Sequence, residues 1–112
     1  VRVGVRRAHT ESVNVQLARP ATLTEVRTLL ASAPGVELVD DRATQTFPTP
    51  LAASDRDPVL VGRIRGDESM PAEGQGDARR FTAFDLFCSG DQIRKGAALN
   101  AVQIGDMVMS SF

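Results

Sequence analysis

Strict alternation of apolar and polar residues constrains this chain more than any other feature of its sequence. Val occupies positions 1, 3 and 5, and the same period returns over residues 13–17. Such alternation is expected of a strand that buries one face, because successive side chains point to opposite sides of a sheet. We therefore predict strands over 1–5 and 13–17, with a strand junction or short bend at 9–11 and with Pro20 ending the second strand.

A different kind of strand is expected over residues 80–88, which are largely apolar on both sides. Two apolar faces predict a strand that is largely buried on both sides. One predicted face carries Phe81, Ala83, Asp85 and Phe87, and the other carries Phe84, Leu86 and Cys88. Shorter apolar segments predict two more strands, over 36–39 and 59–64.

Two segments carry the signals of helices. Thr22 and Glu25 fit the S/T-x-x-E capping box, in which both side chains satisfy free amides at a helix start. Apolar residues then follow at helical spacing until the sequence Ala-Pro-Gly at 33–35 ends the segment. Residues 92–109 repeat apolar residues at three- and four-residue intervals, and Asp91 is placed to cap that helix.

Two loops separate these elements. Residues 40–58 contain three prolines among small polar residues, which predicts a long ordered loop over a surface or a partner subunit. Residues 66–77 are rich in glycine and acidic residues, which predicts a flexible hairpin tip. The order strand, strand, helix, strand, strand, strand, helix predicts an α+β domain with a mostly antiparallel sheet covered by helices.

Composition excludes several functional classes. The 112 residues fit one domain, and 13 basic against 14 acidic residues leave a net charge of −1, which disfavours nucleic acid as a partner. No apolar run approaches the roughly 20 residues that cross a bilayer, so no membrane partner is expected. A single cysteine excludes an internal disulfide and suits the cytoplasm, and one histidine with one cysteine argues against a metal site. Because the chain starts with Val in a strand-like pattern, we expect it to be a piece of a larger protein.

Few side chains here can carry acid–base or nucleophilic chemistry. His9 is the only histidine, so any imidazole step must use it, although a hydrogen-bonded surface histidine is the simpler interpretation. Arg2, Arg6 and Arg7 are close to it in sequence, and they suit either an anionic substrate or a solvated strand face. Cys88 lies just before the last helix, whose positive end lowers a thiol pKa, so a Cys88–His9 nucleophile–base pair is an alternative to plain core packing.

The most distinctive stretch is residues 92–104, Gln-Ile-Arg-Lys-Gly-Ala-Ala-Leu-Asn-Ala-Val-Gln-Ile. Its side-chain amides can pair with another amide, such as the carboxamide of a nicotinamide. Residues 2–11 read Arg-Val-Gly-Val-Arg-Arg-Ala-His-Thr-Glu, and the segments 48–51 and 61–65 read Pro-Thr-Pro-Leu and Val-Gly-Arg-Ile-Arg. Taken together, these segments resemble the C-terminal part of bacterial aspartate-semialdehyde dehydrogenases over nearly the whole chain.

The departures from that family are modest. Thr10 stands where Ser is usual, Gly4 stands where Pro is frequent, and the region 66–80 is longer than typical. The resemblance implies that residues 1–112 form a catalytic and dimerisation domain similar to the C-terminal domain of glyceraldehyde-3-phosphate dehydrogenase. The family's reaction is the NADPH-dependent reduction of L-aspartyl 4-phosphate to L-aspartate 4-semialdehyde, with release of phosphate. It belongs to the biosynthesis of lysine, methionine, threonine and diaminopimelate.

In that family a cysteine forms a thioester, a hydride reduces it, and a histidine acts as general acid and base. By motif position, the resemblance implies that His9 is this histidine, that Arg2 binds the substrate carboxylate, and that Gln92 contacts NADP. Asn100 is a second cofactor-binding candidate. The alternative role for Asn100 and Gln103 is to dock the last helix against the NADP-binding domain. The family's nucleophilic cysteine and most of its cofactor site lie upstream of the matching region, so this chain alone is expected to be inactive.

The implied partners are L-aspartyl 4-phosphate, the rest of the same enzyme, and further copies in a homodimer or homotetramer. An exposed sheet face and the loop 40–58 are the expected contacts between copies. Two other functions stay open from the sequence. One is a non-catalytic relative that keeps the dehydrogenase fold for assembly, and the other is a thiol hydrolase that uses Cys88 and His9.

Overall fold

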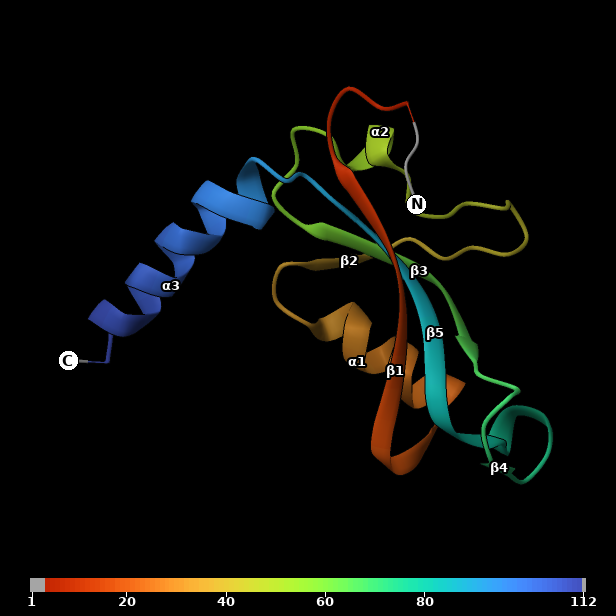
Figure 1. The fold of residues 1–112 in the computed structure, drawn as a ribbon. Helices are drawn as coiled ribbons and strands as arrows, with labels where there is room; N and C mark the ends of the chain where they lie inside the picture. The colour runs from red at the N-terminus through yellow and green to blue at the C-terminus, as the bar shows by residue number, and fades with distance from the viewer. Residues whose placement is uncertain (1–3, 112) are drawn as a thin grey trace.

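A computed structural model describes residues 4–111, which form a five-stranded sheet with α1 packed against it and α3 projecting away from it (Figure 1). The strands are β1 (His9–Thr22), β2 (Val36–Leu38), β3 (Val59–Gly66), β4 (Ala72–Glu73) and β5 (Arg80–Gly90). The helical segments are α1 (Leu23–Ser32), α2 (Pro50–Ala53), the 3-10 turn η1 (Gly76–Ala78), the π-helical turn η2 (Arg94–Ala98) and α3 (Leu99–Met109).

The strand order is β1-β5-β3-β2, and β4 pairs with the start of β5. Only the short pairing of β2 with β3 is parallel, while β5 pairs antiparallel with β1, β3 and β4. The predicted α+β class with a mostly antiparallel sheet is therefore confirmed. β5 lies between β1 and β3, and none of its residues is exposed, which agrees with the prediction of a strand largely buried on both sides.

β1 differs from its prediction at both ends. Residues 9–11 form no bend, because they pair directly with Gly90, Ser89 and Cys88 of β5. Nor does Pro20 end the strand, which continues to Thr22 after a break in register between Gln16 and Ala21. A proline lacks the amide that a ladder needs, and such an irregularity is where a sheet tolerates it.

The strand predicted over 1–5 is not formed at Gly4 and Val5, which lie outside any strand, and its other residues fall outside the described part of the chain. The predicted hairpin tip over 66–77 is more structured than expected, since it contains β4 and the first part of η1. The loop over 40–58 is confirmed as largely irregular, with α2 as its one helical turn.

The capping box at the start of α1 is confirmed. The Oγ1 of Thr22 accepts the Glu25 amide at 3.1 Å, and Oε2 of Glu25 accepts the Thr22 amide at 2.7 Å. Leu23, Val26 and Leu30 then pack on the main core, which contains four buried residues. They are Val61, Ile64, Phe81 and Phe84.

Phe81 and Phe84 contradict the predicted division of β5 into two faces. Their rings meet edge to face with centroids 5.7 Å apart, so both belong to the same core. Residues three apart lie on opposite sides of a regular strand. The ladder is irregular beside them, because β1 advances from Gln16 to Ala21 while β5 advances only from Ala83 to Phe81.

The last helical segment is confirmed but starts later than predicted, as the π-helical turn η2 followed by α3. It does not cover the sheet, and no residue of α3 is buried, so the prediction of a sheet covered by helices holds for α1 alone (Figure 1). Ile104, Met107 and Val108 are all more than half exposed. Within residues 4–111, no helix is long and apolar enough to cross a membrane.

Candidate active site

The face of the sheet that α1 covers continues past the helix toward the other end of β1 (Figure 1). In β1 the side chains of His9 and Glu11 share the side of Val15, because they differ by an even number of positions. Val15 packs on the core beneath α1, and so does Cys88 on β5. His9 therefore lies on the covered side of the sheet but beyond the helix that covers it.

A pocket of about 360 Å³ occupies this uncovered end. It is bounded by the start of β1, the end of β5, the first residue of β3 and the turn into η2. Its lining residues are His9, Glu11, Val59, Cys88, Gly90, Asp91, Gln92, Lys95 and Gly96. The structure thus brings together His9 and Gln92, two site residues predicted from opposite ends of the chain.

The backbone around His9 is held tightly. His9 is the first residue of β1 and pairs with Gly90 of β5. Ala8 just before it is buried against Ala53 and Leu60 and has a φ of 74°. A non-glycine residue rarely adopts that left-handed conformation, so the packing of Ala8 must fix the direction from which the chain enters β1.

Asp91 also lines the pocket, and it is fully buried. One carboxylate oxygen accepts the Nε of Arg7 and the amide of Asp55, both at 2.7 Å. The other accepts the amides of Ile93 at 2.9 Å and Arg94 at 3.4 Å, so Asp91 binds the turn before η2, although the cap position of η2 itself is Ile93 and carries no side-chain cap. Burial alone would raise the pKa of Asp91, but these hydrogen bonds and the Arg7 charge outweigh it and hold the pKa below its usual range.

Cys88 lines the same pocket as His9, yet nothing activates its thiol. Burial, and then the nearby charge of Glu11, raise the pKa of Cys88 above the ordinary value of a thiol. A thiolate is the nucleophilic form, so a raised pKa opposes nucleophilic use at neutral pH. No hydrogen bond joins the Cys88 and His9 side chains among the contacts of residues 4–111, so the structure adds no support for a Cys88–His9 nucleophile–base pair.

The pocket does not include every predicted site residue that the structure describes. Arg2 falls outside the described residues. Asn100 is exposed on α3 and does not line the pocket, while Gln103 accepts a hydrogen bond from Lys95. The described part of the chain contains no group of three His, Cys, Asp or Glu side chains that could hold a metal ion.

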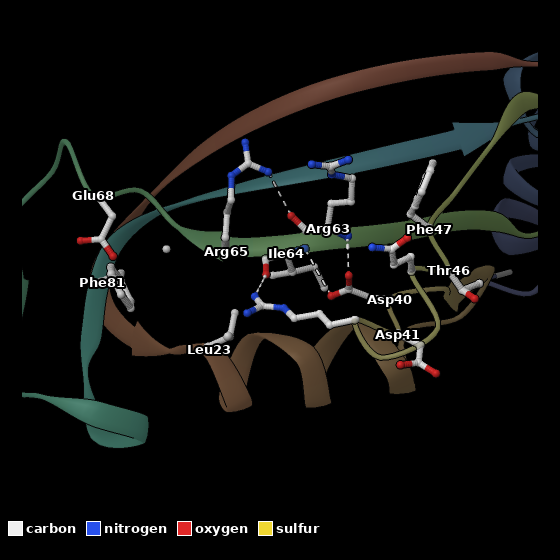
Figure 2. Close-up of a pocket in the computed structure, with 13 residues that line it drawn as sticks. Leu23, Asp40, Asp41, Thr46, Phe47, Arg63, Ile64, Arg65, Glu68 and Phe81 are labelled. Carbon is white, nitrogen blue, oxygen red and sulfur yellow. Dashed lines mark hydrogen bonds between the residues drawn. The ribbon is translucent and has the colours of Figure 1, made fainter.

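A larger pocket of about 840 Å³ lies by the middle of β3 (Figure 2) and contains none of the predicted site residues. Its floor is a bulge in which Arg63 has a φ of 51°. Asp40 holds that bulge, because its carboxylate accepts the amides of Arg63 at 2.7 Å and Ile64 at 3.3 Å and also pairs with Arg27. Asp40 thus binds backbone amides and an arginine that hold the bulge in place, which indicates a structural role. Figure 2 shows the Asp40 carboxylate directed at the β3 backbone.

Sequence reasoning treated Asp91 only as a cap and Asp40 only as the start of a loop. The structure gives both a second role, as buried carboxylates that join distant segments. A short acidic side chain placed directly after an apolar strand is the only local signal, and it is shared by many exposed turns.

Comparison with known proteins identifies the family. Residues 1–95 match the family described as semialdehyde dehydrogenase, dimerisation domain. The chain belongs to this family. An aspartate-semialdehyde dehydrogenase of Synechocystis is 49% identical over 109 residues, which are 97% of this chain and 29% of that protein. Another from Legionella pneumophila is 42% identical over 113 residues, 100% of this chain and 30% of that protein.

Solved structures agree with the sequence relatives. The crystal structure of aspartate semialdehyde dehydrogenase II from Vibrio cholerae matches with a TM-score of 0.80 and 34% identity, over 99% of this chain and 30% of that chain. The semialdehyde dehydrogenase dimerisation domain described here thus spans less than a third of the length of these relatives. The resemblance found from the sequence is confirmed.

Proposed function

We propose that the full-length protein is an aspartate-semialdehyde dehydrogenase that reduces L-aspartyl 4-phosphate to L-aspartate 4-semialdehyde with NADPH. Membership of the semialdehyde dehydrogenase dimerisation-domain family and the named relatives support the enzyme class. The observation that carries the residue roles is the shared pocket of His9 and Gln92. The proposed compartment is the cytoplasm, which rests on the single cysteine and on the reaction's place in amino-acid biosynthesis.

His9 is the proposed general acid and base. Its side chain is exposed in the pocket, so it is open to a reacting group supplied from outside this domain. An imidazole titrates near neutral pH, so His9 can take the proton of a thiol nucleophile and later return a proton. The resemblance to the family places that nucleophile in a part of the enzyme outside this chain, and the raised pKa of Cys88 is consistent with that placement.

Arg2 is the proposed site for the substrate carboxylate. A guanidinium stays charged at all working pH values and binds a carboxylate through two parallel hydrogen bonds. This role follows from the position of Arg2 in the motif shared with the family.

Gln92 fits one end of a nicotinamide cofactor. Its carboxamide is exposed at the rim of the pocket and offers both a donor and acceptors to another carboxamide. NADPH, when bound, supplies the hydride. A pocket of about 360 Å³ accommodates only part of a dinucleotide, so most of the cofactor would be held outside this domain. Asn100, exposed on α3, is proposed to contact the cofactor or to help dock α3.

Two surfaces are proposed to complete the enzyme. α3 exposes large apolar residues and has no buried residue, and we propose that this helix docks on the NADP-binding domain. The sheet face opposite α1 and the loop 40–58 are the proposed contacts between copies in a homodimer or homotetramer, in agreement with the family's description as a dimerisation domain. The isolated chain would then be inactive.

Steady-state kinetics of the full-length protein with L-aspartate 4-semialdehyde, phosphate and NADP test these roles in the reverse direction. His9→Ala should lower kcat by roughly 10²–10⁴-fold, the usual contribution of a general acid–base group. Arg2→Ala should chiefly lower kcat/KM for the semialdehyde. Gln16→Ala, an exposed position on the same strand and outside the pocket, is the control and should leave both constants unchanged. Unchanged turnover of His9→Ala would reject the acid–base role.

A non-catalytic assembly domain is the main alternative, ahead of a thiol hydrolase that uses Cys88 and His9. It predicts that the wild-type full-length protein has no dehydrogenase activity, which the same kinetic assay tests. It also predicts that the protein still forms oligomers, which light scattering tests.

A further inference from the structure

Asp91 joins the two candidate site residues through separate sets of hydrogen bonds. One oxygen of its carboxylate binds Arg7, two residues before His9. The other binds the amide of Ile93, the residue directly after Gln92. His9 therefore lies two residues from a partner of Asp91, and Gln92 lies one residue from another partner of the same buried carboxylate.

The ties to His9 restrict it from two sides. Arg7 is fixed by Asp91 on one side of the left-handed turn at Ala8, and Gly90, the neighbour of Asp91, pairs with His9 across the ladder. A displacement of Asp91 would thus move both the segment that enters β1 and the strand beside it.

The tie to Gln92 is a tight turn. Asp91 accepts the amides of Ile93 and Arg94, so Gln92 is enclosed in the hydrogen-bonded turn from which η2 starts. Side chains of Asp and Asn favour this turn because their oxygen reaches an amide two or three residues later.

The carboxylate also anchors this junction to the rest of the domain. It accepts the amide of Asp55, which follows α2, and the side chain of Asp55 in turn accepts Arg7 at 3.3 Å and Arg94 at 3.0 Å. A buried carboxylate is stable only when its oxygens are satisfied, and here four donors satisfy them. These four hydrogen bonds fix the position of the Asp91 carboxylate.

We propose that Asp91 is a positioning residue, which sets the placement of His9 relative to Gln92 through the Arg7 contact on one side and the turn at Ile93 on the other. The proposal rests on the proposed function of those two residues. It predicts that the two halves of the role can be separated. Asn at position 91 keeps an oxygen for the turn but replaces the oxygen that accepts both the Arg7 side chain and the Asp55 amide, whereas Ala loses both oxygens.

The test uses the full-length protein, with kcat from the reverse assay, the Kd of NADP from calorimetry without substrate, and the Tm. Asp91→Asn should lower kcat by about 10–100-fold, as expected for a misplaced acid–base group, with the NADP Kd changed less than about threefold. Asp91→Ala should lower kcat at least as much and also weaken NADP binding by roughly tenfold. Arg7→Ala should lower kcat to a similar extent as Asp91→Asn, and the double variant should lose little more than either single one, because both variants remove the Arg7–Asp91 contact.

Asp40→Asn is the matched control. Asp40 is a buried carboxylate that also accepts two backbone amides and pairs with an arginine, but it lies in the larger pocket away from His9. It should lower the Tm while leaving kcat and the NADP Kd unchanged. Equal kinetic losses in Asp40→Asn would show a general effect of stability and would overturn the proposal.

Wild-type kinetics in Asp91→Asn and Arg7→Ala would also overturn it, even if Asp91→Ala did not fold. Parallel His9→Ala and Gln92→Ala variants separate this failure from that of the proposed function. If His9→Ala and Gln92→Ala lose activity and NADP affinity while the Asp91 variants do not, only the positioning role is wrong. If His9→Ala keeps its activity, the proposed acid–base role itself fails.

Discussion

Replacing Gly62 with Ala should strongly destabilise the domain, although the change adds a single methyl group. A Cβ at this position would lie 2.0 Å from the carbonyl oxygen of Val39 and 2.7 Å from Cδ of Pro48. Ordinary contacts of a carbon atom are about 3.5 Å long. The chain after β2 and strand β3 must therefore separate by roughly 1 Å or more to admit the methyl group.

Two hydrogen bonds flank the point of contact and would be stretched by that movement. The amide of Val39 donates to the carbonyl of Val61 at 2.8 Å, and the amide of Arg63 donates to Asp40 at 2.7 Å. A bond between neutral groups contributes about 1 kcal/mol net, and one to a charged group about 1.5–3 kcal/mol. Loss of both predicts a fall of about 2.5–4 kcal/mol in the free energy of unfolding.

Urea denaturation of the 112-residue chain measures this change. The chain has no Trp and no Tyr, so far-UV circular dichroism is the suitable probe. Gly4→Ala is the control, because a Cβ there meets nothing within 4 Å, and it should change the free energy by less than about 0.5 kcal/mol. If Gly62→Ala stays within about 1 kcal/mol of wild type at an unchanged m-value, the backbone contact does not constrain β3 and the reasoning is refuted.

Three further predictions concern the core, the start of α1 and the free thiol. Phe84→Ala, which empties a fully buried site, should cost about 3–5 kcal/mol in the same urea assay, and a cost below about 1 kcal/mol would contradict the core assignment. The hydrogen bonds from the backbone and hydroxyl of Thr22 lower the pKa of Glu25 below its ordinary value of 4.5, so its stabilisation is complete above that pH and is lost as the pH falls through the lowered pKa. Glu25→Gln should therefore flatten the dependence of the urea midpoint on pH below about 4.5, while Thr22→Ala should cost about 1 kcal/mol at pH 7; a Glu25→Gln profile as steep as that of wild type would contradict the capping role. The raised pKa of Cys88 predicts that iodoacetamide modifies it more slowly than free cysteine at pH 8, with a rate that still increases above pH 9, and equal rates at pH 8 would show an accessible, ordinary thiol.

The parts of the fold that the sequence predicted well depend on neighbours in the chain. Thr22 and Glu25 are three residues apart, so the box that starts α1 is visible in the sequence, and so is the turn that Asp91 makes with Ile93. Alternation in β1 likewise needs no knowledge of the partner strand. Each of these signals operates within one turn of chain.

The errors came where a partner strand decides the conformation. Whether the strand continues past Pro20 depends on the unpaired stretch opposite Ala83 and Phe81, and not on the proline alone. Residues 9–11 lie between two alternating segments, which predicts a junction or bend, but the pairing with the end of β5 keeps them extended. Local propensity is a weak guide wherever long-range pairing competes with it.

The candidate site was predictable only in part for the same reason. Motif positions marked His9 and Gln92, which the fold brings to one pocket. The buried carboxylates Asp40 and Asp91 bind groups far away in sequence, including Arg63 and Arg7, and no local pattern marks such partners. Their importance follows from burial, which the sequence alone does not reveal.

The irregular ladder between β1 and β5 has a consequence for His9. The smallest slip of β1 that would keep each side chain on its own face is two residues, and it would carry His9 about 6.6 Å along the sheet. In a uniform ladder, the backbone groups would form most of their hydrogen bonds again with new partners after such a slip. Here the break between Gln16 and Ala21 occurs at one place only, so a slipped strand would set its irregular part against the regular part of β5. The interruption that accommodates Pro20 thereby locks the register, and with it the position of the histidine at the far end of the strand.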